Sequence, residues 1–375
     1  MTRIALLGAA NSIHLQRWAH ALVARGHALC ILSQHTAEPG ALPAAAEFVA
    51  LPHTGQLGYV LNARRVRSAL RRWGAELLNA HYASGYGTTA ALCGVRPLLL
   101  SVWGSDVYDF PQESAFKGWL LRRNLRGATA IASTSQAMAR QVQRLVPGID
   151  ANAPIAITPF GVDLAAFAPD ASQRDPAWLT LGIVKTLAPK YGVDLLLRAF
   201  AALLRDPRVQ AAEQSPARPC RLLIVGDGPQ RAELVALAAE LGIAERTRFV
   251  GAVPHADVPA WLNRFDLYAA PSRLDSESFG VAVIEAGACA LPVVVSDVGG
   301  LPEVVRDGET GLVVARDDVP ALQAALTRLI LDPALRERLG AAGRAHVQRE
   351  YDWPRCVDRM EAACADTIAA WARRR

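Results

Sequence analysis

The chain has 375 residues, of which 51% are hydrophobic and 20% are charged. A chain of this length is too long to fold around one ordinary hydrophobic core, which predicts two domains of about 150–200 residues each. Its six cysteines are scattered without a Cys-x-x-Cys pair, which argues against a disulfide framework or a zinc site, and no stretch approaches the roughly 20 apolar residues of a membrane span. No secretory signal precedes the first strand, so we expect a cytoplasmic protein, and the net charge of +5 suits an anionic ligand or surface.

Short apolar runs alternate with helical periodicity over the first part of the chain. A strand at 4–7 leads through a glycine turn into a helix over about 13–25, and further strands are expected at 75–80, 98–102 and 128–133. Alternation of this kind predicts a parallel doubly wound sheet. The dinucleotide pattern Gly-x-Gly-x-x-Gly is absent from the first turn, so a loop that binds nothing stays open as an alternative to a ligand loop.

Polar and aromatic residues follow these strands, at the carboxyl ends where open parallel sheets bind ligands. The candidates for ligand-binding loops are Gly8, Asn11, Ser12, His14, His81 and Trp103. His81 could instead bond a backbone carbonyl at the end of its strand. Asp106 could contact a ligand or simply cap the turn that follows it. Both alternatives stay open.

Basic residues gather on two predicted helices of the first domain. On a helix that includes 59–73, an apolar stripe separates from a basic face. The stripe comprises Tyr59, Val66, Leu70 and Trp73, and the arginines are Arg64, Arg65, Arg67, Arg71 and Arg72. A second cluster comprises Lys117, Arg122, Arg123 and Arg126. These faces are either simply solvated or lie on anionic lipid, where each basic residue contributes about 1 kcal/mol.

A second α/β unit follows a proline-flanked linker at 168–176. Its first strand, 180–184, ends in a loop that carries Lys185 and Lys190, two of only three lysines in the chain. Two ammonium groups at a strand end suit a diphosphate, whose charge needs neutralising from more than one side, although solvated surface lysines are the ordinary alternative. Further strands are expected at 221–225, 247–250, 267–269, 292–296 and 308–314.

Two carboxylates frame an otherwise apolar segment of this unit. Ser278 is expected to cap a helix over 279–290, whose free N–H groups would attract phosphate. Glu277 precedes that helix, and Glu285 lies two turns inside it among residues of a core. A buried carboxylate needs a partner, which would be an arginine or lysine of a neighbouring element or a pair of sugar hydroxyls.

The spacing Glu-x₇-Glu around Ser-Phe-Gly, followed by Leu-Pro-Val-Val-Val-Ser-Asp-Val-Gly-Gly, resembles the donor-site signature of family 4 glycosyltransferases. The resemblance is strong over 180–316 and weak over the first domain. It implies an α/β protein of GT-B architecture, with two Rossmann-like doubly wound parallel-sheet domains that face each other across a cleft. These would be an acceptor-binding domain at 1–167 and a sugar-nucleotide-binding domain at 176–352, with a C-terminal helix at 353–375 that crosses back to the first domain.

The resemblance also implies the activity: a retaining hexosyltransferase that moves a sugar from a nucleoside diphosphate sugar to a hydroxyl acceptor. The two basic faces of the first domain add the hypothesis of a peripheral enzyme at the inner face of the membrane, which glycosylates a lipid-linked acceptor in cell-envelope polysaccharide assembly. Neither a metal, a cofactor beyond the co-substrate, nor nucleic acid is expected.

Individual roles follow from the same resemblance. Lys185, which stands where the family has arginine, and Lys190 would stabilise the leaving diphosphate, and Glu277 would hold the transferred sugar. Trp103 replaces a histidine common in the family, which leaves Asp106 as the expected acceptor contact. The expected donor-binding residues are Gly226, Gly228, Val253, Pro254, Ser278, Phe279, Gly280 and Glu285, the last of them on the ribose.

Three alternatives remain. A sugar-nucleotide epimerase of the same fold would need additional acid and base residues. A nicotinamide oxidoreductase is disfavoured by the missing glycine fingerprint. A non-catalytic sugar-nucleotide-binding protein would tolerate loss of the two carboxylates.

Overall fold

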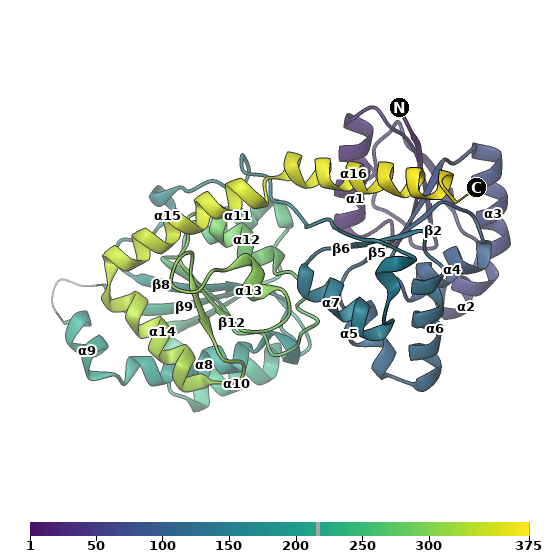
Figure 1. The fold of residues 1–375 in the computed structure, drawn as a ribbon. Helices are drawn as coiled ribbons and strands as arrows, with labels where there is room; N and C mark the ends of the chain where they lie inside the picture. Colours follow the sequence, from purple (N-terminus) through teal and green to yellow (C-terminus); the bar gives the residue numbers. More distant parts are fainter. Residues whose placement is uncertain (215–217, 375) are drawn as a thin grey trace. The chain divides into compact units, whose positions relative to one another are not determined.

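The computed structural model describes residues 1–214 and 218–374, which divide into two compact units (Figure 1). The first unit comprises residues 1–160 together with the C-terminal segment from Pro354, and the second comprises Gly161–Trp353. The division therefore falls at residues 160 and 161, ahead of the proline-flanked segment that the sequence suggested as a linker. Each unit has its own parallel sheet and its own hydrophobic core.

The first unit is built on a seven-stranded parallel sheet with the order β3-β2-β1-β4-β5-β6-β7. The strands are β1 Arg3–Leu7, β2 Ala28–Ser33, β3 Glu47–Ala50, β4 Leu77–His81, β5 Leu98–Val102, β6 Ala130–Ser133 and β7 Ile155–Ile157. The helices are α1 Ile13–Ala24, α2 Gly55–Leu61, α3 Ala63–Trp73, α4 Gly85–Cys93, α5 Ser105–Tyr108, α6 Ala115–Arg126, α7 Gln136–Leu145 and α16 Trp353–Ala372. The strand order reverses between β1 and β4, so ligand loops are expected beyond the carboxyl ends of these strands.

The helix predicted across 59–73 is in fact two helices, α2 and α3, which meet at Asn62. The side-chain amide of Asn62 accepts a hydrogen bond from the N–H of His53 at 3.2 Å and donates one to the carbonyl of His53 at 2.7 Å. That pairing ties the junction to the preceding loop. Val66 and Leu70 are buried on α3, as the periodicity predicts, but Tyr59 belongs to the other helix.

The C-terminal helix α16 packs on the first unit, beside α1 (Figure 1). Glu361 accepts from the guanidinium of Arg25 at 3.1 Å and lies 2.8 Å from Nε2 of His27. Met360 is buried and contacts the side chain of Asn79 on β4. These contacts confirm the predicted return of the C-terminal helix to the first domain.

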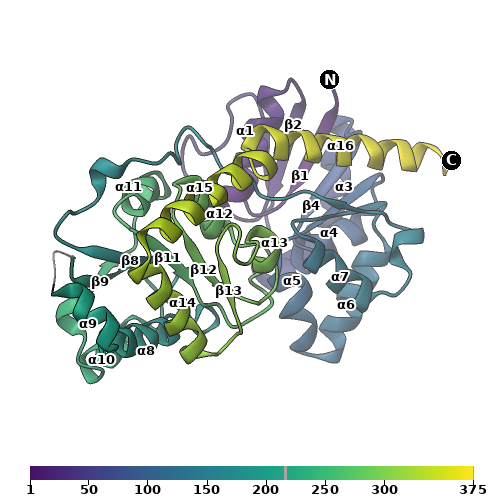
Figure 2. The ribbon, with the colours of Figure 1, turned by 60° about the vertical axis from the view of Figure 1, so that its left-hand side comes forward.

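The second unit has a six-stranded parallel sheet with the order β10-β9-β8-β11-β12-β13. The strands are β8 Leu179–Val184, β9 Cys220–Val225, β10 Thr247–Gly251, β11 Leu267–Ala270, β12 Val293–Ser296 and β13 Leu312–Val314. The helices are α8 Val193–Leu204, α9 Pro207–Glu213, α10 Arg231–Glu240, α11 Val258–Leu262, α12 Val281–Ala288, α13 Leu301–Val304, α14 Val319–Leu331 and α15 Pro333–Glu350. Figure 2 shows α8, α9 and α10 on one face of this sheet and α11 and α12 on the other.

Short 3₁₀ turns connect these elements. They are η1 Phe110–Gln112, η2 Ile149–Ala151, η3 Ala171–Gln173, η4 Pro189–Tyr191, η5 Ala244–Arg246 and η6 His255–Asp257. Two of them, η4 and η6, follow β8 and β10 and so lie at the carboxyl-end edge of the second sheet. Within the described chain, no helix has the length and apolar character needed to span a bilayer.

Candidate active site

A lysine and a glutamate meet at the carboxyl-end edge of the second sheet. Lys185 follows β8, and Glu277 lies in the loop between β11 and α12. Lys185 Nζ lies 2.9 Å from Glu277 Oε1, with 16% and 9% of the two side chains exposed. Burial opposes the charge of Lys185, but Glu277, and after it Tyr191, raise the pKa of this ammonium above its ordinary value. The ammonium of Lys185 is therefore charged at neutral pH.

The second lysine of this loop shares an aromatic partner with the first. Tyr191, in η4, has its ring centroid 4.5 Å from Lys185 Nζ and 4.9 Å from Lys190 Nζ. Such contacts attract a cation to the face of the ring. Lys190 has no carboxylate partner in the part of the chain that the structure describes. Its positive charge therefore remains available to an anion.

Glu285 lies on α12 with 7% of its side chain exposed, and its partner is a histidine. His255 Nε2, in η6, lies 2.9 Å from Glu285 Oε1. The protein partner of this oxygen is therefore a histidine rather than the arginine or lysine considered from the sequence. The histidine side chain is 44% exposed, so a ligand can reach the pair.

The start of α12 differs from the prediction. The helix covers Val281–Ala288, not 279–290, and its N-cap is Gly280, with a φ of 96°, not Ser278. A Cβ at Gly280 would lie 2.6 Å from a methyl group of Leu301, so only glycine fits this turn. The first-turn N–H groups of the helix consequently belong to residues after Gly280 rather than to Phe279, whose buried ring lies against Tyr351.

A glycine pair supports the backbone of Glu277. A Cβ on Gly299 would lie 2.2 Å from the Glu277 carbonyl, and one on Gly300 would lie 2.1 Å from the Ser278 carbonyl. The N–H of Gly300 also donates to the Glu277 carbonyl at 3.1 Å. The turn at Gly299 and Gly300 thus packs directly against the backbone of the loop that carries the Glu277 carboxylate.

Two further glycines, expected to bind the donor, press against the lysine loop. A Cβ on Gly226, whose φ is 134°, would lie 1.9 Å from the carbonyl of Lys185. A Cβ on Gly228 would lie 2.4 Å from the carbonyl of Leu187. Close packing of the loop after β9 against the lysine loop therefore requires glycine at both positions, with or without a ligand. Val253 is half-buried and Pro254 is exposed in the loop after β10, next to His255.

In the first unit, the structure gives Asp106 a different role from the expected acceptor contact. Its side chain is 1% exposed, and its two oxygens accept from the N–H groups of Ala83 at 2.8 Å, Trp103 at 3.1 Å and Gly104 at 2.9 Å. Burial raises the pKa of Asp106, and these backbone donors oppose the shift. The carboxylate joins the loops after β4 and β5, so we assign it a positioning role.

Aromatic rings gather around Trp103 at the carboxyl ends of β4 and β5. The His81 ring lies 5.0 Å from the Trp103 ring, Tyr82 lies 5.4 Å away, and Phe160 lies 5.7 Å away. His14 stacks on Phe160 at 4.0 Å. The structure thus brings together three candidates from the sequence, His14, His81 and Trp103.

His81 is the deepest member of this cluster. It is 1% exposed, and neither ring nitrogen has a hydrogen-bond partner among the described residues. Burial, followed by the nearby His14, lowers the pKa of His81 to about 3, so its ring is neutral. Of the remaining loop candidates, Asn11 is exposed, Ser12 begins α1 without a side-chain cap, and Gly8 packs against Leu15.

A hollow of about 500 Å³ lies at the amino-terminal ends of β8, β9 and β10, where tryptophans and arginines such as Trp178 and Arg248 line it. The candidate site residues of the second unit lie at the other edge of the sheet and do not line it. Nowhere in residues 1–214 and 218–374 do three or more His, Cys, Asp or Glu side chains gather as a metal site would require.

Known proteins match both units. Residues 171–346 match the family described as Glycosyl transferases group 1, and residues 3–135 match the one described as Glycosyl transferase 4-like. A GDP-mannose-dependent alpha-(1-6)-phosphatidylinositol monomannoside mannosyltransferase of Mycolicibacterium smegmatis is 32% identical over 285 residues, or 71% of this chain and 69% of that protein. A D-inositol 3-phosphate glycosyltransferase of Thermomonospora curvata is 32% identical over 343 residues, or 85% of this chain and 71% of that protein.

The fold has a close match among solved structures. The sucrose-phosphate synthase of Thermosynechococcus elongatus superposes with a TM-score of 0.83 at 22% identity, covering 99% of this chain and 100% of that one. Identity above 30% over more than two thirds of two relatives, together with matched families in both units, establishes the family. The chain belongs to the family 4 glycosyltransferases and is a glycosyltransferase of the GT-B fold.

Proposed function

We propose that this glycosyltransferase binds a nucleoside diphosphate hexose on its second unit and transfers the sugar with retention of anomeric configuration. The observation that carries the proposal is the convergence of two lysines and two carboxylates at one edge of one sheet. Lys190 has no acidic partner among the described residues, and the oxygens Oε2 of Glu277 and Glu285 also have none there. Each group therefore retains binding capacity for a ligand.

The charges of this edge match the parts of such a donor. The leaving diphosphate gains negative charge as the glycosidic bond breaks, and Lys185 and Lys190 would stabilise it together with the first turn of α12. Glu277 would accept hydrogen bonds from hydroxyls of the hexose, and Glu285 from those of the ribose. Because the two ammonium groups supply the positive charge, we propose that the enzyme needs no metal and no cofactor.

The reaction consists of one bond exchange. The acceptor hydroxyl oxygen bonds to the anomeric carbon, the bond from that carbon to the diphosphate oxygen breaks, and the acceptor's proton passes to the departing phosphate oxygen. Attack from the face that the leaving group vacates retains the configuration. Neither Asp106 nor His81 is needed as a base, in agreement with the saturated carboxylate of the first and the burial of the second.

The relatives guide the choice of substrates. One is named as dependent on GDP-mannose and acts on a phosphatidylinositol mannoside, and the other is named for D-inositol 3-phosphate. We propose a hydroxyl acceptor that is lipid-linked, within cell-envelope glycan assembly, and GDP-mannose as the first donor to test.

A surface of the first unit would suit contact with an anionic membrane from the cytoplasmic side. Leu57 and Leu61 on α2 are 74% and 55% exposed, and Phe116 and Trp119 on α6 are 66% and 53% exposed. Helix α4 packs against both α2 and α6. Helix α3, which follows α2, carries exposed arginines. The surface therefore combines exposed apolar side chains with positive charge.

A donor panel tests the proposal. We expect slow hydrolysis of one nucleoside diphosphate sugar, faster turnover when a lipid-linked hydroxyl acceptor is added, and NMR detection of an anomeric configuration equal to that of the donor. A changed sugar nucleotide without acceptor would indicate the epimerase alternative. Binding without any turnover would indicate a non-catalytic protein.

A further inference from the structure

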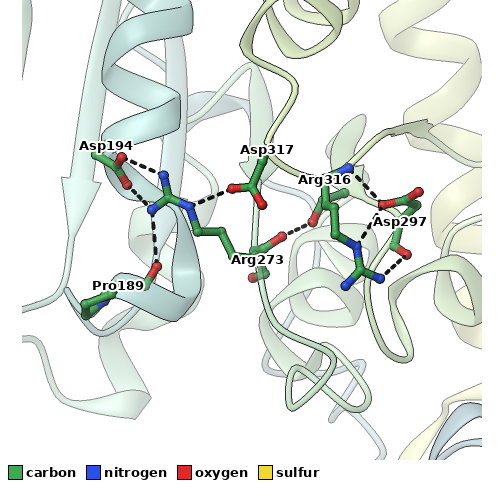
Figure 3. Close-up of polar contacts among 8 residues, drawn as sticks. Pro189, Asp194, Arg273, Asp297, Arg316 and Asp317 are labelled. Carbon is green, nitrogen blue, oxygen red and sulfur yellow. Dashed lines mark hydrogen bonds and ion pairs between the residues drawn. The ribbon is translucent and has the colours of Figure 1, made fainter.

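Arg273 lies in the loop between β11 and α12, four residues before Glu277, and its guanidinium uses all of its nitrogens (Figure 3). Nη1 and Nη2 bind the two oxygens of Asp194 at 2.6 and 2.7 Å, in the first turn of α8. Nε donates to Asp317 at 2.7 Å, after β13. Arg273 thus connects three loops of the second unit at the carboxyl ends of its strands.

The same residue holds the turn that carries Lys190. The backbone N–H of Arg273 donates to the carbonyl of Lys190 at 2.8 Å, and Nη1 donates to the carbonyl of Pro189 at 3.4 Å. Two residues after Lys190, a Cβ at Gly192 would lie 2.0 Å from the carbonyl of Pro271. The turn over 189–192 is therefore pressed against the chain segment that leads to Glu277.

A second arginine extends the arrangement. Arg316, next to Asp317, binds Asp275 at 2.9 Å and lies 3.6 Å from Asp297, which follows β12 (Figure 3). The ion pairs of this arrangement involve Asp194, Arg273, Asp275, Asp297, Arg316 and Asp317. Two guanidinium groups thus join the loops after β8, β11, β12 and β13 around the candidate site.

The geometry at Asp194 distinguishes this pair from an ordinary surface ion pair. Arg273 and Asp194 are 27% and 19% exposed, and they meet through two parallel N–H···O bonds. A fork of this kind fixes orientation as well as distance, which the single ammonium of a lysine cannot do. Arg208 also forks onto Asp206, at 3.1 and 2.7 Å, but its side chain is 69% exposed and its partner lies two residues away in the chain. That pair therefore connects no separate loops, and an ion pair so exposed contributes little.

We propose that Arg273 is a positioning residue that fixes the turn bearing Lys190 and Tyr191 against the donor site. The inference rests on the proposed function for the role of Lys190. Through the backbone of this turn, Arg273 determines where the Tyr191 ring lies, and that ring contacts both ammonium groups at 4.5 and 4.9 Å. Displacement of the turn would move Lys190 away from the diphosphate.

The expected effect falls on turnover more than on donor affinity. A misplacement of about 1 Å at a reacting group costs up to roughly 100-fold in rate, so Arg273→Ala should lower kcat by about 10- to 100-fold with a smaller change in KM. Arg273→Lys should be impaired nearly as much because it retains the charge without the fork. Arg208→Ala, in the same unit, is the matched control and should match the wild type.

The test has two parts, and the first needs no donor. Hydrogen exchange of the full chain should show faster exchange of the amides of residues 190–192 in Arg273→Ala than in the wild type or in Arg208→Ala. Unchanged exchange there would overturn the proposal. The control also excludes a general loss of stability, because exchange in the first unit should stay unchanged in both variants.

The second part combines Arg273→Ala with Lys190→Ala. If Arg273 acts through Lys190, the two kcat losses should be strongly non-additive, with the double variant close to Lys190→Ala alone. Fully additive losses would overturn the proposal. A wild-type protein that turns over no donor in the panel would refute the proposed function, and the exchange result would still decide whether Arg273 holds the turn.

Discussion

Lys185 and Lys190 differ in what they contact, and that difference assigns them different tasks. Lys185 is paired with Glu277 at 2.9 Å, so its charge is partly compensated before any ligand arrives. The ammonium of Lys190 lies against an aromatic ring and has no acidic partner among the described residues. An ammonium without a carboxylate partner stabilises the negative charge that develops on a leaving group more strongly than a paired one does.

The first prediction follows for Lys190. Lys190→Ala should lower kcat by about 10²- to 10³-fold, the loss that accompanies removal of one charge-stabilising donor. Steady-state kinetics with the active donor measure the effect. Lys117→Ala, which removes the remaining lysine, on the first unit, is the control. A collapse of donor affinity with kcat preserved would make Lys190 a binding residue only.

The second prediction concerns Glu285, which would hold the ribose throughout the reaction. Because this contact exists in the ground state and the transition state alike, Glu285→Gln should weaken binding and spare turnover at saturation. A hydrogen bond to a charged group is worth about 1.5–3 kcal/mol, or roughly 10- to 100-fold in Kd. Calorimetry with the nucleoside diphosphate measures the loss. Affinity equal to that of Glu240→Gln, an exposed control, would refute the ribose role.

The third prediction concerns pH and His81. Its folded pKa of about 3 lies below the ordinary value near 6.5, so below pH 6.5 the unfolded chain binds a proton that the folded chain does not. Stability is therefore lost as the pH falls. Between pH 7 and 5 the wild type should lose about 2 kcal/mol of unfolding free energy through His81.

Urea denaturation at the two pH values checks this prediction. His81→Phe should show a pH-dependent loss smaller than that of the wild type by the same amount. His20→Gln, an exposed histidine on α1, should behave as the wild type does. Equal pH dependence of His81→Phe and the wild type would contradict the buried neutral ring.

The sequence was enough to predict some residues of the candidate site but not their partners. Lys185, Glu277 and Glu285 stood out because rare lysines and carboxylates in apolar surroundings need an explanation, and the structure brings them to one sheet edge. His255 and Arg273 were missed as partners, since each reaches its carboxylate from a loop that is remote in the chain. No local pattern indicates which loops face one another.

At the scale of elements, the strand-end loops of the second unit determine the site. The apolar strands were predictable because central parallel strands are buried on both faces. The edge strand β3 was missed because it has only four residues, which are mostly exposed although Phe48, Val49 and Ala50 are apolar. The start of α12 was predicted too early because Ser278 is a good capping residue by type, whereas packing against Leu301 selects Gly280.

The fourth prediction compares two glycines of left-handed conformation. Gly299 has a φ of 52° and Gly308 a φ of 71°, so alanine costs about 1–2 kcal/mol of backbone strain at either. Only at Gly299 would the new Cβ also meet a carbonyl, that of Glu277, at 2.2 Å, since the space at Gly308 is open. Gly299→Ala should cost a further 1–3 kcal/mol or so and displace Glu277.

Thermal unfolding and nucleotide titration measure the two effects. We expect Gly308→Ala to bind nucleoside diphosphate as the wild type does, and Gly299→Ala to bind at least about tenfold more weakly. Equal stability and equal affinity of the two variants would show that the Gly-Gly turn does not support the Glu277 loop.

At the scale of the whole molecule, each unit brings a different chemistry. The second unit holds the ammonium and carboxylate groups, and the first holds an aromatic cluster around Trp103 and a basic, partly apolar surface. Two domains, both parallel sheets and the returning helix were predictable from the alternation of elements and the family signature. The membrane contact stays a prediction.

The fifth prediction tests that contact with liposomes rich in anionic lipid. Three exposed arginines on α3 contribute about 1 kcal/mol each, so neutralising them together should weaken binding by roughly a hundredfold at low salt. The three are Arg64, Arg65 and Arg71, because Arg67 already donates to the Cys93 carbonyl. Trp119→Ala should weaken binding further at high salt. Co-sedimentation unaffected by these changes would favour an acceptor free in solution.

A matched control keeps the change of net charge constant. Neutralising three exposed arginines of the second unit, Arg198, Arg248 and Arg328, should leave liposome binding nearly unchanged. Equal losses in both triple variants would attribute the binding to overall charge rather than to the surface of the first unit.

Calorimetric titration of the full chain with GDP and with UDP, in EDTA, tests the central claim most directly. The account predicts that one of them binds without added metal, and that Lys185→Met, which removes the ammonium beside Glu277, weakens binding at least about tenfold. Binding that appears only after Mg²⁺ is added, or an affinity unchanged in Lys185→Met, would contradict the assignment of the diphosphate to the lysines of the second unit.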